Sequence, residues 1–371
     1  MSGILRKPTN RLIIAGGGTG GHFYPGVAIA EEWLSRKPEA DVLFVGTERG
    51  IEAREAPALG YKVELLRVLP LKRMSLLQKI KSLLILPFAI WDAYKIIKSY
   101  DPDYIIGVGG YAAGPMGAAA WLSGRPLFLL EQNSVPGFTN KILGKLASLV
   151  FLTFAAATKY FPLKNSVIVG NPLRKAALEA INNKLIAAER PLLVITGGSQ
   201  GALALNNLVL DALQLMGERA KEFDIVHQCG ETGLETTKRR YQELGLTAEV
   251  EPFIKDIVSL FAKAHLVIGR AGATTVCELN ALATPAIYIP FPYAADDHQR
   301  INAQEAVEAG AALAFDQFKT NAKEIAEAIE KIILNPALQK EMSEAAKRIG
   351  KPEAARETVD KIISFKPRLK L

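Results

Sequence analysis

Five of the six residues from Gly16 to Gly21 are glycine, and this run directly follows four apolar residues, Leu12 to Ala15. A short apolar run is typical of a buried strand, and glycines let the backbone turn sharply and approach a large ligand. Apolar residues at helical spacing from Val27 to Leu34 then predict a helix. This order constrains the fold most, because it puts the first-turn amides of a helix beside the loop, where they attract phosphate or another anion.

The same loop satisfies the dinucleotide fingerprint G-x-G-x-x-G through Gly16, Gly18 and Gly21. That fingerprint also needs an acidic residue at the end of the second strand to bind a ribose, and Glu48 is the candidate. A single fingerprint is weak evidence, since many such loops are only tight turns between a strand and a helix. The rest of the chain must distinguish these alternatives.

With 371 residues, of which 49% are hydrophobic, the chain is long enough for two globular domains and is expected to be an α/β enzyme. Its two cysteines, Cys229 and Cys277, exclude a disulfide framework and a structural zinc site, which favours a reducing compartment. The uncharged stretch from Tyr104 to Gly124 holds six glycines and a proline, so it predicts a strand, a loop and a helix rather than a membrane span.

The net charge of +7 is concentrated between Lys62 and Tyr100, where eight basic residues stand against two acidic ones. The same segment contains the apolar run from Ser82 to Trp91. Two interpretations stay open: a core helix with a solvated basic face, or a surface that rests on an anionic membrane. Nucleic acid is a poorer fit, because the spread of basic and stacking residues that such binders use is missing.

Strand-like runs alternate with helix-like segments along the chain, which predicts parallel sheets covered by helices. Beyond Leu12–Ala15, the expected strands are residues 41–46, 62–66, 104–108, 127–131, 149–152, 192–196, 225–229, 266–269 and 286–289. The glycine loop recurs loosely at residues 197–201, an offset of 180 from Gly17. Two doubly wound domains, each opening with strand, glycine loop and helix, explain this repeat, with the join near Val169 to Lys175.

Three segments of the second half supply polar groups for a ligand. Ser199 in the second glycine loop can donate a hydroxyl hydrogen bond to phosphate, and the loop lacks the G-K-[ST] ending of a P-loop. The segment from Gly269 to Leu282 has small residues for close ligand approach, and Glu278 either binds a ribose or only complements the helix dipole.

The run Asp296-Asp297-His298-Gln299 is better explained by a helix start than by a metal site, since consecutive acids on a helix cannot converge on one ion. Asp297 is predicted as the N-cap, with Gln299 and Asn302 reaching outward to a polar ligand.

In the first half, His22 follows the glycine loop and is a candidate general base, although a lone histidine is more often structural.

Taken together, seven motifs in this order resemble the MurG family, the N-acetylglucosaminyltransferases that complete the bacterial cell-wall lipid precursor. The motifs are GGTGGHFYPG, GGYAAGP, EQNSVPG, GNPLR, GGSQGA, RAGATTVCE and DHQRINA. The resemblance implies the GT-B fold, an α/β fold of two Rossmann-like, doubly wound parallel-sheet domains facing a cleft. It implies an acceptor-binding, membrane-contacting domain at residues 1–169, with a C-terminal helix near 352–371 packing back on it, and a UDP-N-acetylglucosamine-binding domain at 170–351.

The resemblance also implies the substrates and the residues that hold them. The donor is UDP-N-acetylglucosamine, with uracil at the Ile254 backbone, ribose at Glu278 and the sugar at Gln299 and Asn133. The expected donor-binding residues are Thr19, Gly20, Gly21, Asn133, Arg174, Ser199, Gln200, Gly201, Ile254, Ala273, Thr274, Thr275, Glu278 and Gln299. The acceptor is undecaprenyl-diphosphate-linked N-acetylmuramoyl-pentapeptide, and no cofactor or metal is expected.

For the acceptor diphosphate, the expected seat consists of Gly17, Gly18, Thr19, Gly20, Gly21 and Tyr111, with His22 as the base for an inverting transfer. A polyprenyl-linked acceptor must be met at a membrane, so the resemblance favours the membrane interpretation of the basic segment and a peripheral place on the cytoplasmic face of the bacterial cell membrane. The expected membrane contacts are Lys72, Arg73, Leu76, Lys79, Ile80, Leu83, Leu84, Phe88 and Trp91.

Three rival functions remain at this point. Another GT-B enzyme with a lipid acceptor shares the architecture and differs in its donor sugar. A nicotinamide-dependent oxidoreductase would use Gly16, Gly18, Gly21 and Glu48 but leaves the second-half motifs unexplained. A catalytically silent nucleotide-binding protein is disfavoured because His22, Glu278 and Gln299 are all present.

Overall fold

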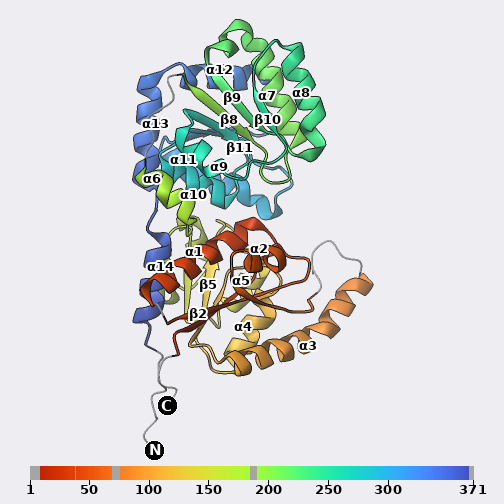
Figure 1. The fold of residues 1–371 in the computed structure, drawn as a ribbon, viewed down its shortest axis with the longest axis vertical. Coiled ribbons are helices and arrows are strands. Elements are labelled where there is room, and N and C mark those ends of the chain that lie inside the picture. The colour runs from red at the N-terminus through yellow and green to blue at the C-terminus, as the bar shows by residue number, and fades with distance from the viewer. Residues whose placement is uncertain (1–8, 38, 69–75, 184–189, 367–371) are drawn as a thin grey trace, which may run out of the picture. The chain divides into compact units, whose positions relative to one another are not determined.

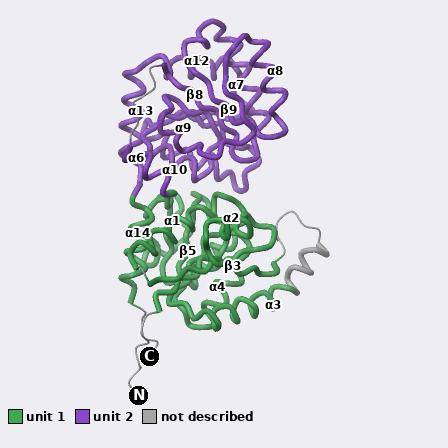
Figure 2. Tube along the Cα trace, in the orientation of Figure 1, with its two compact units in different colours: residues 1–174, 353–371 green, residues 175–352 purple. Residues whose placement is uncertain are grey.

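The computed structural model describes residues 9–37, 39–68, 76–183 and 190–366, and for residues 76–84 only the course of the backbone. The chain forms two compact units (Figure 2). Unit 1 comprises Met1–Arg174 and Glu353–Leu371, and unit 2 comprises Lys175–Pro352. The C-terminal segment therefore belongs to the same unit as the N-terminal sheet.

In the described part of unit 1, seven parallel strands form one sheet in the order β3-β2-β1-β4-β5-β6-β7. The strands are β1 (Arg11–Ala15), β2 (Asp41–Gly46), β3 (Lys62–Leu65), β4 (Tyr104–Gly107), β5 (Leu127–Glu131), β6 (Leu149–Leu152) and β7 (Ser166–Ile168). In the centre, Ile14 pairs with Phe44 on one side and with Ile106 on the other. The sheet confirms the expected parallel α/β architecture.

Helices cover both faces of this sheet (Figure 1). They are α1 (Gly20–Arg36), α2 (Glu52–Ala58), α3 (Leu76–Tyr100), α4 (Ala113–Leu122), α5 (Phe138–Leu143) and α14 (Ala354–Ser364), with 3-10 turns η1 (Ala155–Tyr160) and η2 (Leu163–Asn165). Successive side chains of β1 point to opposite faces of the sheet, as in any strand. Ile14 packs in a core with Trp33 of α1 and Ile362 of α14, whereas Ile13 packs in a core with Ile97 of α3 and Met116 of α4.

Unit 2 repeats this plan with six parallel strands, among its described residues, in the order β10-β9-β8-β11-β12-β13. The strands are β8 (Leu192–Thr196), β9 (Asp224–Gln228), β10 (Glu249–Glu251), β11 (Leu266–Gly269), β12 (Ala286–Tyr288) and β13 (Ala312–Ala314). The α-helices are α6 (Lys175–Asn182), α7 (Leu203–Met216), α8 (Leu234–Glu243), α9 (Ile257–Lys263), α10 (Ala273–Leu282), α11 (His298–Glu308), α12 (Ala322–Ile333) and α13 (Pro336–Ile349). The 3-10 turns are η3 (Gly217–Glu222), η4 (Glu231–Gly233) and η5 (Ala295–Asp297).

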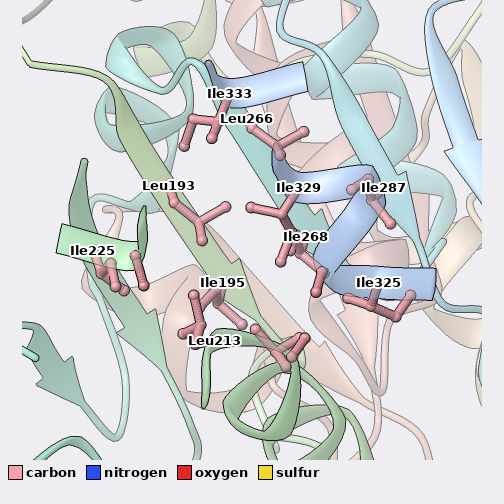
Figure 3. Packing of buried hydrophobic residues seen from close by; sticks show 14 of the residues in the cluster. Leu193, Ile195, Leu213, Ile225, Leu266, Ile268, Ile287, Ile325, Ile329 and Ile333 are labelled. Atoms are coloured by element: carbon pink, nitrogen blue, oxygen red, sulfur yellow. The ribbon is translucent and has the colours of Figure 1, made fainter. Parts of the chain in front are cut away.

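One face of the unit 2 sheet is closed by two helices that flank its central strands. Leu193 and Ile195 of β8 meet Leu213 of α7 and Ile329 of α12 in this core (Figure 3). These side chains are essentially inaccessible to solvent. The strands around β8 are therefore held rigidly, and so are the starting points of the loops that follow them.

Both sheets reverse their strand order at the strand that precedes a glycine loop. β1 lies between β2 and β4, and β8 lies between β9 and β11. In doubly wound folds, ligands bind outside the carboxyl ends of the strands at such a reversal point. The recurring glycine loops therefore lie at the position where each unit is expected to bind a ligand.

The C-terminal helix α14 offers a direct test of the unit 1 core. Ile362 is 0% exposed and packs in the core with β1 and α1, whereas its neighbour Ile363 is 39% exposed. We predict that Ile362→Ala lowers the free energy of unfolding by about 2–4 kcal/mol, since it removes a buried side chain and leaves a cavity, while Ile363→Ala changes it by less than about 1 kcal/mol. Urea denaturation measures both, and equal losses would contradict the packing of α14 on unit 1.

Candidate active site

The glycine loop after β1 is held by hydrogen bonds from its own amides. The amides of Gly16 and Gly17 donate to the carbonyls of Val45 and Gly109 at 2.9 and 3.1 Å. The Gly18 amide donates to the Glu52 carboxylate at 2.6 Å. All three glycines have positive φ, between 87° and 132°, which explains why the run cannot carry side chains.

Helix α1 begins directly after these bonds. Thr19 is its N-cap and makes no side-chain cap hydrogen bond, and Thr19 and Gly21 are exposed. In any first turn, the carbonyls that could accept from the amides lie four residues earlier, outside the helix, so α1 itself offers no acceptor to the amides of Thr19, Gly20 and Gly21. The helix start therefore presents donors and the positive end of the helix dipole to solvent.

His22 stands on the first turn of α1 and is oriented by a buried glutamine. Its Nδ1 lies 3.1 Å from Oε1 of Gln132, which is only 1% exposed. Gln132 donates through Nε2 to the carbonyl of Val108 at 2.8 Å, so its oxygen is the atom that faces His22. We assign the proton of the neutral imidazole to Nδ1 on this ground, and Nε2 then carries the lone pair that a base needs. A Cβ at Gly109 would lie 2.8 Å from Nδ1, so glycine is required there.

The loop after β5 is organised by Glu131, which is 1% exposed. Its carboxylate accepts from the amides of Asn133 and Gly137 at 3.0 and 3.3 Å and from Nδ2 of Asn140 at 2.8 Å. Burial raises the pKa of Glu131 to about 7, and these hydrogen bonds act in the opposite direction. Glu131 thus fixes the turn that carries Asn133 at the same sheet edge as His22.

Arg174, the last residue of unit 1, is held against helix α1. Its guanidinium lies 4.9 Å from the ring centre of Tyr24, within the range of a cation–π interaction. A Cβ added to Gly20 would lie 3.2 Å from the same Tyr24 ring. Tyr24 therefore places the charge of Arg174 beside the start of α1, at Thr19 and Gly20.

Tyr111, the remaining residue expected at the acceptor diphosphate, follows β4 and is 42% exposed.

In unit 2, Gln228 ties the second glycine loop to the segment after β10. Its Nε2 donates to the Gly198 carbonyl at 3.0 Å, and its Oε1 accepts from the Ile254 amide at 2.9 Å. Gly198 and Gly201 have positive φ, and Ser199 and Gln200 between them are exposed. The structure thus brings Ser199 and Ile254 to one edge of the sheet through a residue that sequence reasoning did not single out.

Helix α10 contributes the third element. Gly272 is its N-cap, and Ala273, Thr274 and Thr275 form its first turn, where Thr274 Oγ1 has no hydrogen-bond partner among the described residues. Glu278 is buried on the second turn, at 3% exposure. Just before the helix, Arg270 donates to the carbonyls of Ile289 and Pro290 and to Gln317, and burial lowers its pKa to about 10.

The start of α11 departs from expectation. Asp297 occupies the N-cap position, but its side chain caps no amide and pairs with Arg300 instead. Gln299 accepts from the Phe291 amide at 2.9 Å. Asn302 is 0% exposed and donates to the Ala271 carbonyl at 3.3 Å, so the prediction that it reaches outward is wrong. Asn302 lies on the buried face of α11, so its side chain cannot contact a ligand that binds from solvent.

Only part of the expected membrane surface lies within the described residues. Lys72 and Arg73 lie outside them, and so do the side chains of Leu76, Lys79, Ile80, Leu83 and Leu84, whose backbone belongs to α3. Phe88 and Trp91 are 71% and 60% exposed, whereas Ala93 of the same helix is buried. None of the helices in the described ranges has the length and apolar character that crossing a bilayer requires.

The sequence matches two family descriptions that together cover most of the chain. The glycosyltransferase family 28 N-terminal domain matches residues 12–152, and the glycosyltransferase family 28 C-terminal domain matches residues 192–358. The first match spans the glycine loop, His22 and Gln132, and the second spans Ser199, Glu278 and Gln299.

Two curated relatives carry the same enzyme name, UDP-N-acetylglucosamine–N-acetylmuramyl-(pentapeptide) pyrophosphoryl-undecaprenol N-acetylglucosamine transferase. The relative from Myxococcus xanthus is 43% identical over 350 residues, which cover 94% of this chain and 91% of the relative. That from Syntrophus aciditrophicus is 42% identical over 357 residues, which cover 96% of this chain and 99% of the relative.

Solved structures agree with this assignment. MurG from Acinetobacter baumannii matches with a TM-score of 0.77 and 30% identity, covering 96% of this chain and 99% of that chain. UDP-GlcNAc 2-epimerase from Neisseria meningitidis, bound to UDP-GlcNAc, matches with a TM-score of 0.70 at 14% identity, which shows a shared fold alone. The predicted fold class, two Rossmann-like parallel-sheet domains of the GT-B type, is confirmed. The chain is a glycosyltransferase and belongs to the MurG family of N-acetylglucosamine transferases.

Proposed function

We propose that this enzyme transfers N-acetylglucosamine from UDP-N-acetylglucosamine to the 4-hydroxyl of undecaprenyl-diphosphate-linked N-acetylmuramoyl-pentapeptide, a step of peptidoglycan synthesis. The observation that carries the proposal is the 43% identity to a relative named for this transfer, over 94% of the chain. The arrangement of His22, Gln132 and the helix start of α1 supports the same chemistry.

On this proposal, unit 2 binds the nucleotide part of the donor. The Ile254 amide donates to Gln228, so the Ile254 carbonyl is the backbone group assigned to uracil, whose N3–H is a donor. Glu278 accepts from the ribose hydroxyls, while Ser199, Gln200, Gly201 and the first turn of α10 donate to the diphosphate. Gln299 is assigned to the sugar, and the sugar contact of Asn133 remains a prediction.

Unit 1 then binds the acceptor. Because the amides of Gly17 and Gly18 donate within the protein, the diphosphate seat is assigned to the amides of Thr19, Gly20 and Gly21. Tyr111 is exposed and follows Gly110, where a Cβ would collide with the Gly17 carbonyl oxygen. Arg174 lies against Tyr24 of α1. An arginine beside a helix N-terminus suits an anion, since both contribute positive charge and directed donors.

The transfer is a single in-line displacement with inversion. The acceptor O4 forms a bond to the anomeric carbon of N-acetylglucosamine as the bond from that carbon to the β-phosphate oxygen breaks, and the electron pair leaves with UDP. His22 takes the hydroxyl proton at Nε2, the nitrogen that the Gln132 contact leaves as acceptor. Helix N-termini stabilise the departing diphosphate. No cofactor or metal is assigned a role, which remains a prediction.

The lipid acceptor also gives helix α3 a function. Phe88 and Trp91 are exposed on the face opposite Ala93, and exposed aromatic side chains beside lysines suit an anionic bilayer surface. We therefore propose that the enzyme works as a peripheral protein on the cytoplasmic face of the bacterial membrane. Lys72, Arg73, Leu76, Lys79, Ile80, Leu83 and Leu84 remain predicted contacts.

The test of the proposed function is transfer of labelled N-acetylglucosamine from its UDP donor to a short-chain lipid analogue of the muramoyl-pentapeptide diphosphate. We expect selective transfer, with UDP-galactose and UDP-glucose giving little product. Preference for UDP-galactose would favour a different lipid glycosyltransferase. NADH binding, followed by fluorescence, would support the oxidoreductase alternative, which rests on Gly16, Gly18, Gly21 and Glu48.

In the same assay, His22→Ala should lower kcat by about 10²- to 10⁴-fold, the usual contribution of a general base. The Kd for UDP-N-acetylglucosamine, measured by calorimetry, should stay within about twofold of wild type, because binding does not use the proton transfer. A variant that bound the donor weakly but kept its turnover at saturation would show that His22 is a binding residue and not the base.

Glu131 predicts a pH dependence of stability. The unfolded chain releases this proton near pH 4.5, whereas the folded protein keeps it until about pH 7, so the free energy of unfolding falls as the pH rises between these values and is level above them. The size of the effect is about 3 kcal/mol. Glu131→Gln should remove this fall in urea denaturation at a series of pH values, whereas Glu64→Gln, at an exposed site, should keep it. A fall of the same size in all three proteins would refute the assignment to Glu131.

A further inference from the structure

A second acidic residue follows β2, and it is turned inward. Glu52, the first residue of α2, is 1% exposed, whereas Glu48, four residues earlier, is exposed. One Glu52 oxygen, Oε2, accepts from the Gly18 amide at 2.6 Å. The other, Oε1, accepts from the Thr47 amide at 2.8 Å and from the Thr47 hydroxyl at 3.3 Å. The carboxylate therefore joins the loop after β1 to the loop after β2.

Burying a carboxylate is costly unless its oxygens are satisfied. Among the ion pairs of the described residues, none involves Glu52, so hydrogen bonds from the two loops replace a cationic partner. Backbone amides are fixed in direction, and a charged acceptor makes shorter, stronger hydrogen bonds than a neutral one. This set of donors holds Gly18 in one orientation.

The chain also makes room for this carboxylate. A Cβ at Gly17 would lie 2.6 Å from Cδ of Glu52, and a Cβ at Gly46 would lie 2.7 Å from the same atom. Gly50 lies similarly close to the carboxylate. Gly17 of the loop after β1, Gly46 at the end of β2 and Gly50 of the loop after β2 therefore enclose Glu52. This accounts for part of the glycine content that a ligand site alone would not require.

We infer that Glu52 is the positioning residue for the diphosphate seat of unit 1, an inference that rests on the proposed function. By holding the Gly18 amide, Glu52 fixes the direction in which the chain enters α1, and thus where Thr19, Gly20 and Gly21 present their amides. The negative charge of Glu52 also lies against Gly17 and Gly18. It repels an anion from this part of the loop, so the anion binds at the start of α1. Glu52 touches neither substrate and acts through the loop.

The test replaces Glu52 by glutamine, which has the same shape and one acceptor oxygen fewer. Its NH2 group must then face the amide of Gly18 or of Thr47, donor against donor. Glu48→Gln is the matched control, because it makes the same change four residues earlier, at an exposed position in the loop between β2 and α2. Transfer kinetics with the short-chain lipid analogue give KM for each substrate, and amide deuterium exchange reports on residues 16–22.

For Glu52→Gln we expect KM for the lipid analogue to rise about tenfold, the change expected when one buried acceptor is lost, with KM for UDP-N-acetylglucosamine within about twofold. Deuterium uptake in residues 16–22 should be faster, and Glu48→Gln should match wild type in every measurement. A general loss of stability would not raise one KM alone.

Unchanged kinetics and exchange in Glu52→Gln, or an equal rise of both KM values, would overturn the inference. If wild type transfers no sugar, the proposed function fails separately. The exchange comparison between Glu52→Gln and Glu48→Gln then still decides whether Glu52 holds the loop.

Discussion

Three amide hydrogen bonds, donated by Gly16, Gly17 and Gly18, hold the loop on which the unit 1 site depends. Their acceptors belong to β2, to the loop after β4 and to the side chain of Glu52. Because all three donors are used inside the protein, the next amides along the chain, at the start of α1, are the ones that can meet a ligand. A glycine-rich loop of this kind acts less as a phosphate cradle than as the support of a helix start.

The same constraint explains how His22 obtains its orientation. His22 is on the turn that the loop positions, and Gln132 reaches it from the end of β5 while being anchored to the Val108 carbonyl. Glu131, directly before Gln132, fixes the following turn through three hydrogen bonds. Parallel strands bring these loops together, since their carboxyl ends share one edge. Unit 2 uses the same topology, with Gln228 joining the glycine loop to Ile254.

Much of this architecture could be predicted from the sequence because buried parallel strands are apolar runs, and those runs match the central strands. The strands that sequence reasoning missed, β7, β10 and β13, are each three residues long and lie at sheet edges, where burial is partial. Asn302 was misplaced because its neighbours do not reveal which face of α11 is buried. Glu52 and Gln132 were not assigned roles. Glu52 is one of several acidic residues after β2, and the sequence does not show which of them is buried. Gln132 is a single amide side chain after a strand, and no local pattern distinguishes it.

The central claim is that unit 2 binds the nucleotide of the donor and unit 1 binds the acceptor diphosphate, each at the reversal point of its sheet. Amide deuterium exchange of the whole enzyme, with UDP-N-acetylglucosamine alone and with the lipid analogue alone, tests it most directly. The account predicts that the donor slows exchange mainly at residues 198–201, 252–256 and 270–278, and the acceptor analogue at residues 16–24 and 109–112. Protection of residues 16–24 by the UDP donor alone, without protection around Ser199 and Glu278, would contradict it.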